Sequence, residues 1–205
     1  MREIKPVKVG NCILDGKLIY IQSMLNTRSD DIAGSVAQAV ALEQAGCEIV
    51  RAAIPNHEAI ALIPAIKEKI SIPLVADIHF DYRLALEAAE AGIDKIRINP
   101  GNIGGMSRVQ EVVHACQERQ IPIRNSGSLE KEILAKYGAP TAEALVESAM
   151  GHVHMLEECG FDDIVISMKS SDVNTMIDAY RLCAQQCNYP LHLGVTEAGT
   201  LMGSA

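Results

Sequence analysis

Four basic residues stand in, or directly after, short apolar runs that are typical of buried strands. They are Arg51 in EIVRAAI, Arg97 in KIRIN, Arg124 in IPIR and Lys169 in DIVISMK. A charge inside a buried strand is costly unless an opposite charge meets it, so these cations imply anions. Guanidinium groups match phosphate oxygens through paired hydrogen bonds, which makes a diphosphate or similar polyanion a suitable partner.

Carboxylates and other polar side chains accompany these cations. Asp77 and His79 stand two residues apart in PLVADIH and therefore face the same side of a strand, either as a general acid–base pair or as a structural hydrogen bond. Glu197 ends the run LHLGVTE, and Asn99 ends KIRIN directly before Pro100-Gly101. Asp77 and Glu197 neutralise about two of the four cations, so phosphate fits the remaining positive charge.

Two other interpretations of these polar residues stay open. Arg51 and Arg97 can also point outward, between strand and helix, and pair with helix carboxylates. Convergence of four cations at one end of a sheet favours the anion site over that arrangement. His152 and His154 fall in the middle of a predicted helix and are expected on the surface.

The elements that must position these residues repeat along the chain. EQAGCEIVR (43–51), EAAEAGIDKIR (87–97) and LEECGFDDIVIS (156–167) each end a helix, pass through a glycine and begin an apolar run. Glycine suits the left-handed residue that follows a helix, so each phrase predicts a helix-to-strand joint. Strands that alternate with helices predict a parallel sheet.

The α/β repeat predicts a TIM-type (β/α)₈ barrel, in which the active site lies at the carboxyl ends of the strands. Seven strands are recognisable, and the eighth is missing from this chain. They are predicted at residues 18–24, 48–54, 73–79, 95–99, 121–124, 163–169 and 191–197. An opening hairpin, with a turn at Asp15-Gly16, is expected to cap the bottom of the barrel.

Composition narrows the possible partners. A net charge of −8 argues against a nucleic-acid surface, which needs a basic excess, and no apolar run reaches the length of a membrane span. Six scattered cysteines suit a reducing, cytoplasmic location better than a disulfide framework. Cys183 and Cys187 are the closest pair, but two thiols do not complete a metal site, and none is predicted.

Six ordered stretches resemble the 4-hydroxy-3-methylbut-2-enyl diphosphate synthases of the non-mevalonate isoprenoid pathway. The stretches are IQSMLNT, GCEIVRAAIP, PLVADIHFDYRLAL, KIRINPGNIG, KYGAPTAEALVESA and YPLHLGVTEAG. The resemblance implies an oxidoreductase that reductively opens 2-C-methyl-D-erythritol 2,4-cyclodiphosphate and removes a hydroxyl. A 4Fe-4S cluster and a ferredoxin or flavodoxin supply the electrons in that family.

The resemblance also implies roles for individual residues. Arg51, Arg97, Arg124 and Lys169 would bind the substrate, with Asn99 and Asn125 near its phosphates, and Glu197, Asp77 and His79 would be catalytic. The family's cluster ligands, three cysteines and a glutamate in a C-terminal domain, have no match here. Residues 1–205 are therefore predicted to be the substrate-binding barrel of a homodimeric enzyme, inactive in reduction by itself. The connection after Arg124 is three residues shorter than in the family pattern.

Two alternative functions for this chain remain open. The first is a pterin-binding transferase of the dihydropteroate synthase type, whose barrels have similar polar strand ends. The second is a non-catalytic phosphate-binding barrel that serves as a partner subunit.

Overall fold

A six-stranded parallel sheet forms the centre of the computed structural model, which describes residues 2–125 and 129–194. The strands run in sequence order, β3-β4-β5-β6-β7-β8, so each joins its neighbour through a crossover. They are β3 (Gln22–Met24), β4 (Ile49–Ala53), β5 (Leu74–Asp77), β6 (Lys95–Ile98), β7 (Ile123–Asn125) and β8 (Ile164–Val165). The α/β class and the TIM-type order predicted from the sequence are confirmed.

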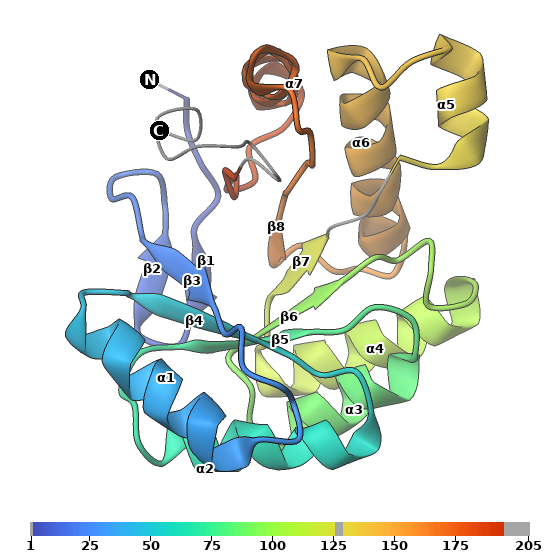
Figure 1. Ribbon diagram of the computed structural model, residues 1–205. Coiled ribbons are helices and arrows are strands. Elements are labelled where there is room, and N and C mark those ends of the chain that lie inside the picture. The colour runs from blue at the N-terminus through green and yellow to red at the C-terminus, as the bar shows by residue number, and fades with distance from the viewer. Residues whose placement is uncertain (1, 126–128, 195–205) are drawn as a thin grey trace.

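Helices cover one face of this sheet, and the curve of the strands leaves the other face inside an open barrel (Figure 1). The helices are α1 (Ile32–Gln44), the 3₁₀ turn η1 (His57–Ala61), α2 (Leu62–Lys67), α3 (Tyr82–Glu90), α4 (Met106–Arg119), α5 (Lys131–Tyr137), α6 (Ala142–Glu158) and α7 (Val173–Gln186). Gly46, Gly92 and Gly160 have φ values of 91°, 84° and 72° at the three predicted helix-to-strand joints. These glycines take the left-handed conformation that a side chain resists.

The observed strands are shorter than the predicted ones. The predicted first strand begins at residue 18, but pairing starts only at Gln22, and Leu18 and Ile19 are exposed. The predicted seventh strand is represented in the described residues by one parallel bridge, Ile166 to Leu191, and its residues beyond 194 lie outside them. The predicted strands were too long because they were assigned from apolar residues, which continue into the loops.

The N-terminal hairpin is confirmed, but the predicted position of its turn is wrong. Strand β1 (Val7–Val9) pairs antiparallel with β2 (Cys12–Leu14), and Val9 opposes Cys12. The turn is therefore Gly10-Asn11, with Gly10 at φ 55°, rather than Asp15-Gly16. A glycine in the first position of a two-residue turn matches the twist of the paired strands. Val7 and Val9 pack on Val165 and help to fill the barrel interior.

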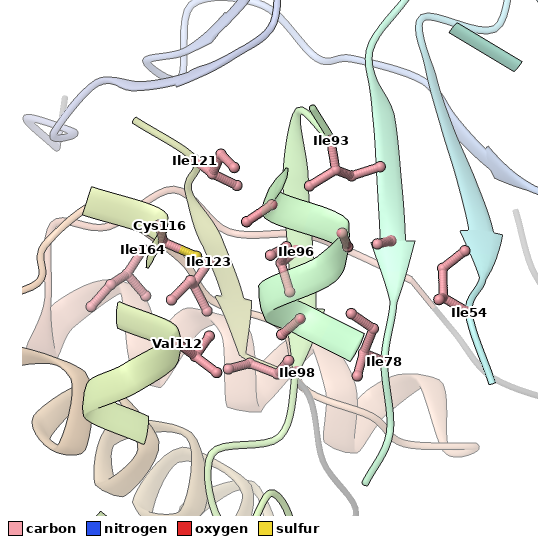
Figure 2. Close-up of a cluster of buried hydrophobic side chains, with 14 of the residues drawn as sticks. Ile54, Ile78, Ile93, Ile96, Ile98, Val112, Cys116, Ile121, Ile123 and Ile164 are labelled. Carbon is pink, nitrogen blue, oxygen red and sulfur yellow. The ribbon is translucent and has the colours of Figure 1, made fainter. Parts of the chain in front are cut away.

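The main core lies between the sheet and its helices. Figure 2 shows Ile96, Ile98 and Ile123 beside Val112 and Cys116 of α4, and all five side chains are buried. The alternate residues of β6, Lys95 and Arg97, are buried as well. Because successive strand residues point to opposite faces, burial of the isoleucines against α4 directs Lys95 and Arg97 into the barrel.

Candidate phosphate-binding site

Strand register places four predicted site residues and Lys95 in two adjacent rows on the barrel face. Arg97 pairs with Asp77 on one side and with Arg124 on the other, which forms the upper row. The lower row runs through Arg51, Val75 and Lys95. Residues in register in a parallel sheet share a face, so these charges are brought together by backbone pairing.

Asp77 is the carboxylate at the centre of this group. Its Oδ1 accepts a 2.7 Å hydrogen bond from Arg97 Nη1, and its Oδ2 lies 3.6 Å from Arg51 Nε. Asp77 and Arg97 are only 3% and 5% exposed. The outward orientation considered for the two arginines is therefore not the one observed, because both point toward Asp77.

His79 lies above this pair and is half exposed. Its Nε2 is 3.6 Å from Asp77 Oδ1, and its Nδ1 lies 3.2 Å from Arg97 Nη1. An arginine only donates, so Nδ1 acts as the acceptor in this contact. The geometry matches the predicted proximity to Asp77.

Arg124 is buried and lacks a carboxylate partner among the described residues. Its Nη2 donates to Ser167 Oγ at 2.7 Å, whereas Nε and Nη1 have no hydrogen-bond partner there. Burial, followed by the nearby Arg51 and Arg97, lowers the pKa of Arg124 to about 9. Two buried guanidinium nitrogens without acceptors mark a position where an anion would bind favourably.

Lys169 completes the predicted set of cations. Partial burial and then Arg97 lower the pKa of its ammonium, while Asp77 acts in the opposite direction. The backbone at this end of β8 is held by Tyr180 of α7, whose hydroxyl accepts from Met168 N–H at 3.1 Å. Lys169 thus stands next to an anchored backbone but keeps an exposed side chain.

Lys95 is a further cation that we did not predict from the sequence. It is 1% exposed, its Nζ donates to Gln22 Oε1 at 3.4 Å, and no described carboxylate pairs with it. Burial, followed by repulsion from Arg124 and Arg51, lowers the pKa of Lys95 to about 7. Its position two residues before Arg97 on the same strand was the signal for its orientation. It borders a cavity of about 340 Å³ together with Tyr20 and His192.

Asn99 organises the turn after β6. Its Oδ1 accepts the Gly101 N–H at 3.0 Å, and its carbonyl oxygen accepts the Asn102 N–H at 2.9 Å. A Cβ atom on Gly101 would lie 3.3 Å from both Asn99 Oδ1 and His152 Nε2. Glycine at this position therefore allows close approach of the turn to its neighbours.

His152 is buried, so the prediction that it lies on the surface is wrong, whereas His154 is exposed as expected. His152 Nε2 lies 2.6 Å from Glu130 Oε1, and burial lowers the pKa of the imidazole. His152 shares the inner face of α6 with Ala149 and Leu156, three and four residues away, and that spacing was the missed signal.

Asn125 does not join the cations. Its Nδ2 donates to Ala149 O of α6 at 3.4 Å, and its Oδ1 accepts from Ser167 N–H at 2.9 Å. It follows Arg124 directly, so alternation directs it to the helix side of the strand. Glu197, the other predicted carboxylate, lies outside the described residues.

The described residues do not fit an iron–sulfur cluster or another metal centre. Among residues 2–125 and 129–194, no three His, Cys, Asp or Glu side chains are placed to hold one ion. Cys183 and Cys187 approach each other to 3.9 Å between sulfurs, which supplies two soft ligands where a cluster needs four. Within the same residues, no helix is long and apolar enough to cross a membrane.

Residues 4–205 match the family model described as the GcpE TIM-barrel domain. The chain belongs to the GcpE TIM-barrel family. The predicted resemblance is thereby confirmed, since the similar curated proteins include the 4-hydroxy-3-methylbut-2-en-1-yl diphosphate synthases (flavodoxin) of Clostridium perfringens and Bacillus cytotoxicus. They are 59% identical over 203 residues and 57% identical over 201 residues.

The alignments cover 97% and 96% of this GcpE-family chain but only 58% and 55% of the two relatives. The chain therefore spans little more than half the length of these enzymes. Among solved structures, dihydropteroate synthase from Xanthomonas albilineans in complex with 7,8-dihydropteroate aligns with a TM-score of 0.65 at 15% identity. That alignment covers 91% of this chain and 76% of the other. Identity this low shows a shared barrel fold and carries no information on the ligand.

Proposed function

We propose that this chain is the substrate-binding barrel of a 4-hydroxy-3-methylbut-2-enyl diphosphate synthase. In this proposal it binds 2-C-methyl-D-erythritol 2,4-cyclodiphosphate, and the whole enzyme reductively opens and dehydroxylates that substrate. The relatives' names support the reaction and flavodoxin as the electron donor, with ferredoxin as the other candidate. The free cysteines support a cytoplasmic location.

The observation that carries the proposal is the charge imbalance around Asp77. Arg51, Arg97, Arg124 and Lys169 surround a single described carboxylate, and Arg124 has two buried nitrogens without acceptors among the described residues. A diphosphate supplies both the negative charge and the acceptors. The guanidinium groups are already held by strands, so little side-chain ordering accompanies binding.

Asp77, His79 and Glu197 are the proposed catalytic residues, and Asn99 and Asn125 complete the proposed substrate-binding set. His79, which is half exposed beside Asp77, is proposed to exchange a proton with a bound ligand. Asn99 acts by shaping the turn that faces the phosphates. Asn125 acts from the helix side by fixing the backbone of Ser167, the residue that accepts from Arg124.

The electrons require a 4Fe-4S cluster held outside this chain, because the described donor set does not fit one. We therefore expect the 205-residue chain to bind the cyclic diphosphate without reducing it. Iron, sulfide and a strong reductant added to this chain alone should yield no product. Product formation there would contradict the proposal that the barrel binds the substrate and a separate cluster domain supplies the electrons.

Calorimetric titration with the cyclic diphosphate tests the binding itself. Arg97→Ala should weaken affinity by about 2 kcal/mol, since a charge-assisted contact is lost. Arg181→Ala is the matched control, because Arg181 is exposed and its nearest carboxylate oxygen is 3.9 Å away. Titration with 7,8-dihydropteroate tests the pterin alternative, which requires binding of that ligand and no response to the cyclic diphosphate. Binding of the cyclic diphosphate without turnover, even after fusion to a cluster domain, would instead support a non-catalytic subunit.

A further inference from the structure

The two sulfurs at the end of α7 lie in a position that the substrate site does not use. Cys183 is buried in the last turn of the helix, and Cys187 is the half-buried residue that follows it. Their Sγ atoms are 3.9 Å apart. Cys187 has left the helix, with φ −146° and ψ 169°, so its side chain is not fixed by helical geometry.

Two groups lie close to the Cys187 sulfur. Cys183 Sγ and Arg2 Nη2 are each 3.9 Å from it, and Cys187 Sγ itself donates to Cys183 O at 3.5 Å. The same Arg2 nitrogen donates to the Tyr189 carbonyl oxygen, which holds the guanidinium in place. Glu157, whose carboxylate accepts from the Tyr189 hydroxyl at 2.8 Å, is the opposing charge.

These contacts divide the roles of the two cysteines. The hydrogen bond with Cys183, followed by the Tyr189 backbone and Arg2, lowers the pKa of Cys187 against the effect of its partial burial. The same hydrogen bond and burial raise the pKa of Cys183. Cys187 is half-buried and lies beside Arg2, whereas Cys183 is buried, so Cys187 is the sulfur assigned as the nucleophile.

We propose that Cys187 is a peroxide-reactive thiolate with Cys183 as its resolving partner, so that hydrogen peroxide converts the pair into an intramolecular disulfide. The nearby Arg2 guanidinium, the partial exposure of Cys187 and the adjacent buried sulfur carry this assignment. It is independent of the function proposed for the barrel interior.

The chemistry balances in two steps. The Cys187 thiolate attacks one peroxide oxygen, the S–O bond forms, the O–O bond breaks, and hydroxide leaves and becomes water on protonation. Cys187 is then a sulfenic acid, oxidised by two electrons that have reduced the peroxide. Cys183 next loses its proton and attacks the Cys187 sulfur, so that the S–S bond forms while the S–O bond breaks and a second water leaves.

Closing the bond requires the sulfurs to move from 3.9 Å to about 2.05 Å. The backbone N–H of Cys187 donates to Cys183 O as the helix cap, so rotation of the two side chains must close this gap. A disulfide is uncharged, so its formation removes the attraction between the thiolate and Arg2. The segment next to Arg2 is also held by Lys5 N–H, which donates to Asn188 O at 2.8 Å, and we expect this contact to remain.

Peptide mapping of the full 205-residue chain after brief iodoacetamide treatment at pH 7 is the first test. Cys187 should be alkylated at least tenfold faster than Cys159, a half-buried cysteine whose pKa is raised by burial. Arg2→Gln should slow alkylation of Cys187 severalfold and leave Cys159 unchanged. This comparison within one molecule does not depend on how well a cysteine variant folds.

Peroxide treatment is the second test. Mass spectrometry should show loss of two hydrogens and a peptide linking Cys183 to Cys187. In Cys183→Ser, dimedone should instead trap a sulfenic acid on Cys187. Equal alkylation of Cys187 and Cys159, or oxidation that goes elsewhere, would overturn the proposal.

Discussion

Arg97 Nη1 lies 2.7 Å from Asp77 Oδ1, and the two residues are direct register partners on β5 and β6. Both side chains are buried, so the ion pair is shielded from the solvent that would weaken it. Arg51 approaches the same carboxylate from β4. Asp77 therefore compensates two guanidinium groups in the barrel, and several consequences can be measured.

Asp77→Asn should destabilise the chain by about 3 kcal/mol, because Arg97 and Arg51 would remain buried without their shared carboxylate. Chemical denaturation at pH 7 measures this loss. Asp30→Asn is the control, since Asp30 pairs with Arg28 in an exposed position, where solvent screens the charges, and its loss should have a much smaller effect. Equal effects at the two positions would contradict the importance assigned to the buried pair.

Arg124→Met should preserve the stability of the chain but weaken its affinity for phosphate. The variant removes a buried cation with two unpartnered nitrogens, so we expect stability to be retained or increased. Affinity for inorganic pyrophosphate should fall about tenfold or more, because the variant lacks the guanidinium that would donate hydrogen bonds to the ligand. Parallel melting and titration experiments separate the two effects. A variant that melts early and still binds pyrophosphate would show that Arg124 has a structural role.

Lys95→Met should change how stability depends on pH. The pKa of Lys95 is about 7 in the folded chain against 10.5 for an ordinary lysine, so the unfolded state binds more protons between these values. The native chain should therefore become more stable as pH rises through this window, by at most about 5 kcal/mol. Below pH 7 the lysine is charged in both states and its full cost is present.

The methionine variant should lose this pH dependence and exceed the parent in stability most clearly below pH 7. Urea denaturation at pH 6, 8 and 9.5 provides the comparison. Lys67→Met is a useful control, because Lys67 is partly exposed and paired with Asp94 at 2.7 Å. Parallel pH profiles for the parent and the Lys95 variant would show that the buried ammonium is better compensated than its contacts indicate.

His152→Leu should destabilise the chain by about 2 kcal/mol at pH 7, since Glu130 would lose its buried partner. His154→Leu, an exposed position two residues away on α6, is the matched control. The pKa of His152 is lowered by burial, so the parent should also lose stability as pH falls through about 6.5. His152→Gln should lack that acid-dependent component.

Exposed apolar residues before β3 should promote self-association, in keeping with the homodimer predicted from the sequence. Leu18, Ile19 and Ile21 are 67%, 93% and 62% exposed, next to a strand that is paired on one side in the described residues. Sedimentation of the parent should reveal a dimer or larger species, and Ile19→Lys should shift it toward monomer. A parent chain that remains monomeric at high concentration would contradict this expectation.

The sequence predicted the structure best at positions where a residue type has one usual structural role. Glycine at the ends of helices predicted the joints, and arginines in apolar runs predicted the group around Asp77. Lys95 was missed because a lysine at the start of a strand is ordinarily solvated. Only the inward direction of Arg97, two residues later, reveals its burial.

The errors have a similar physical origin. The hairpin turn was assigned to Asp15-Gly16 because both Asp-Gly and Gly-Asn are good turn formers, and only the pairing of Val9 with Cys12 decides between them. His152 was placed on the surface by residue type, although its helical spacing from Ala149 and Leu156 put it on the inner face. The direction of Asn125 depends on the register of a three-residue strand, which composition does not specify.

The alternation along β6 also limits which changes of length the chain can accept. Lys95 and Arg97 face the barrel, while Ile96 and Ile98 face the helices. Deleting one residue would turn an arginine toward α4 and an isoleucine toward the proposed phosphate-binding position, so the packing on both faces of the strand would be disrupted. Substitutions that keep the character of each face should be accepted far more readily. Insertions and deletions in variants of this protein should therefore concentrate in the connections, such as the one that follows Asn102, and spare the four residues of the strand.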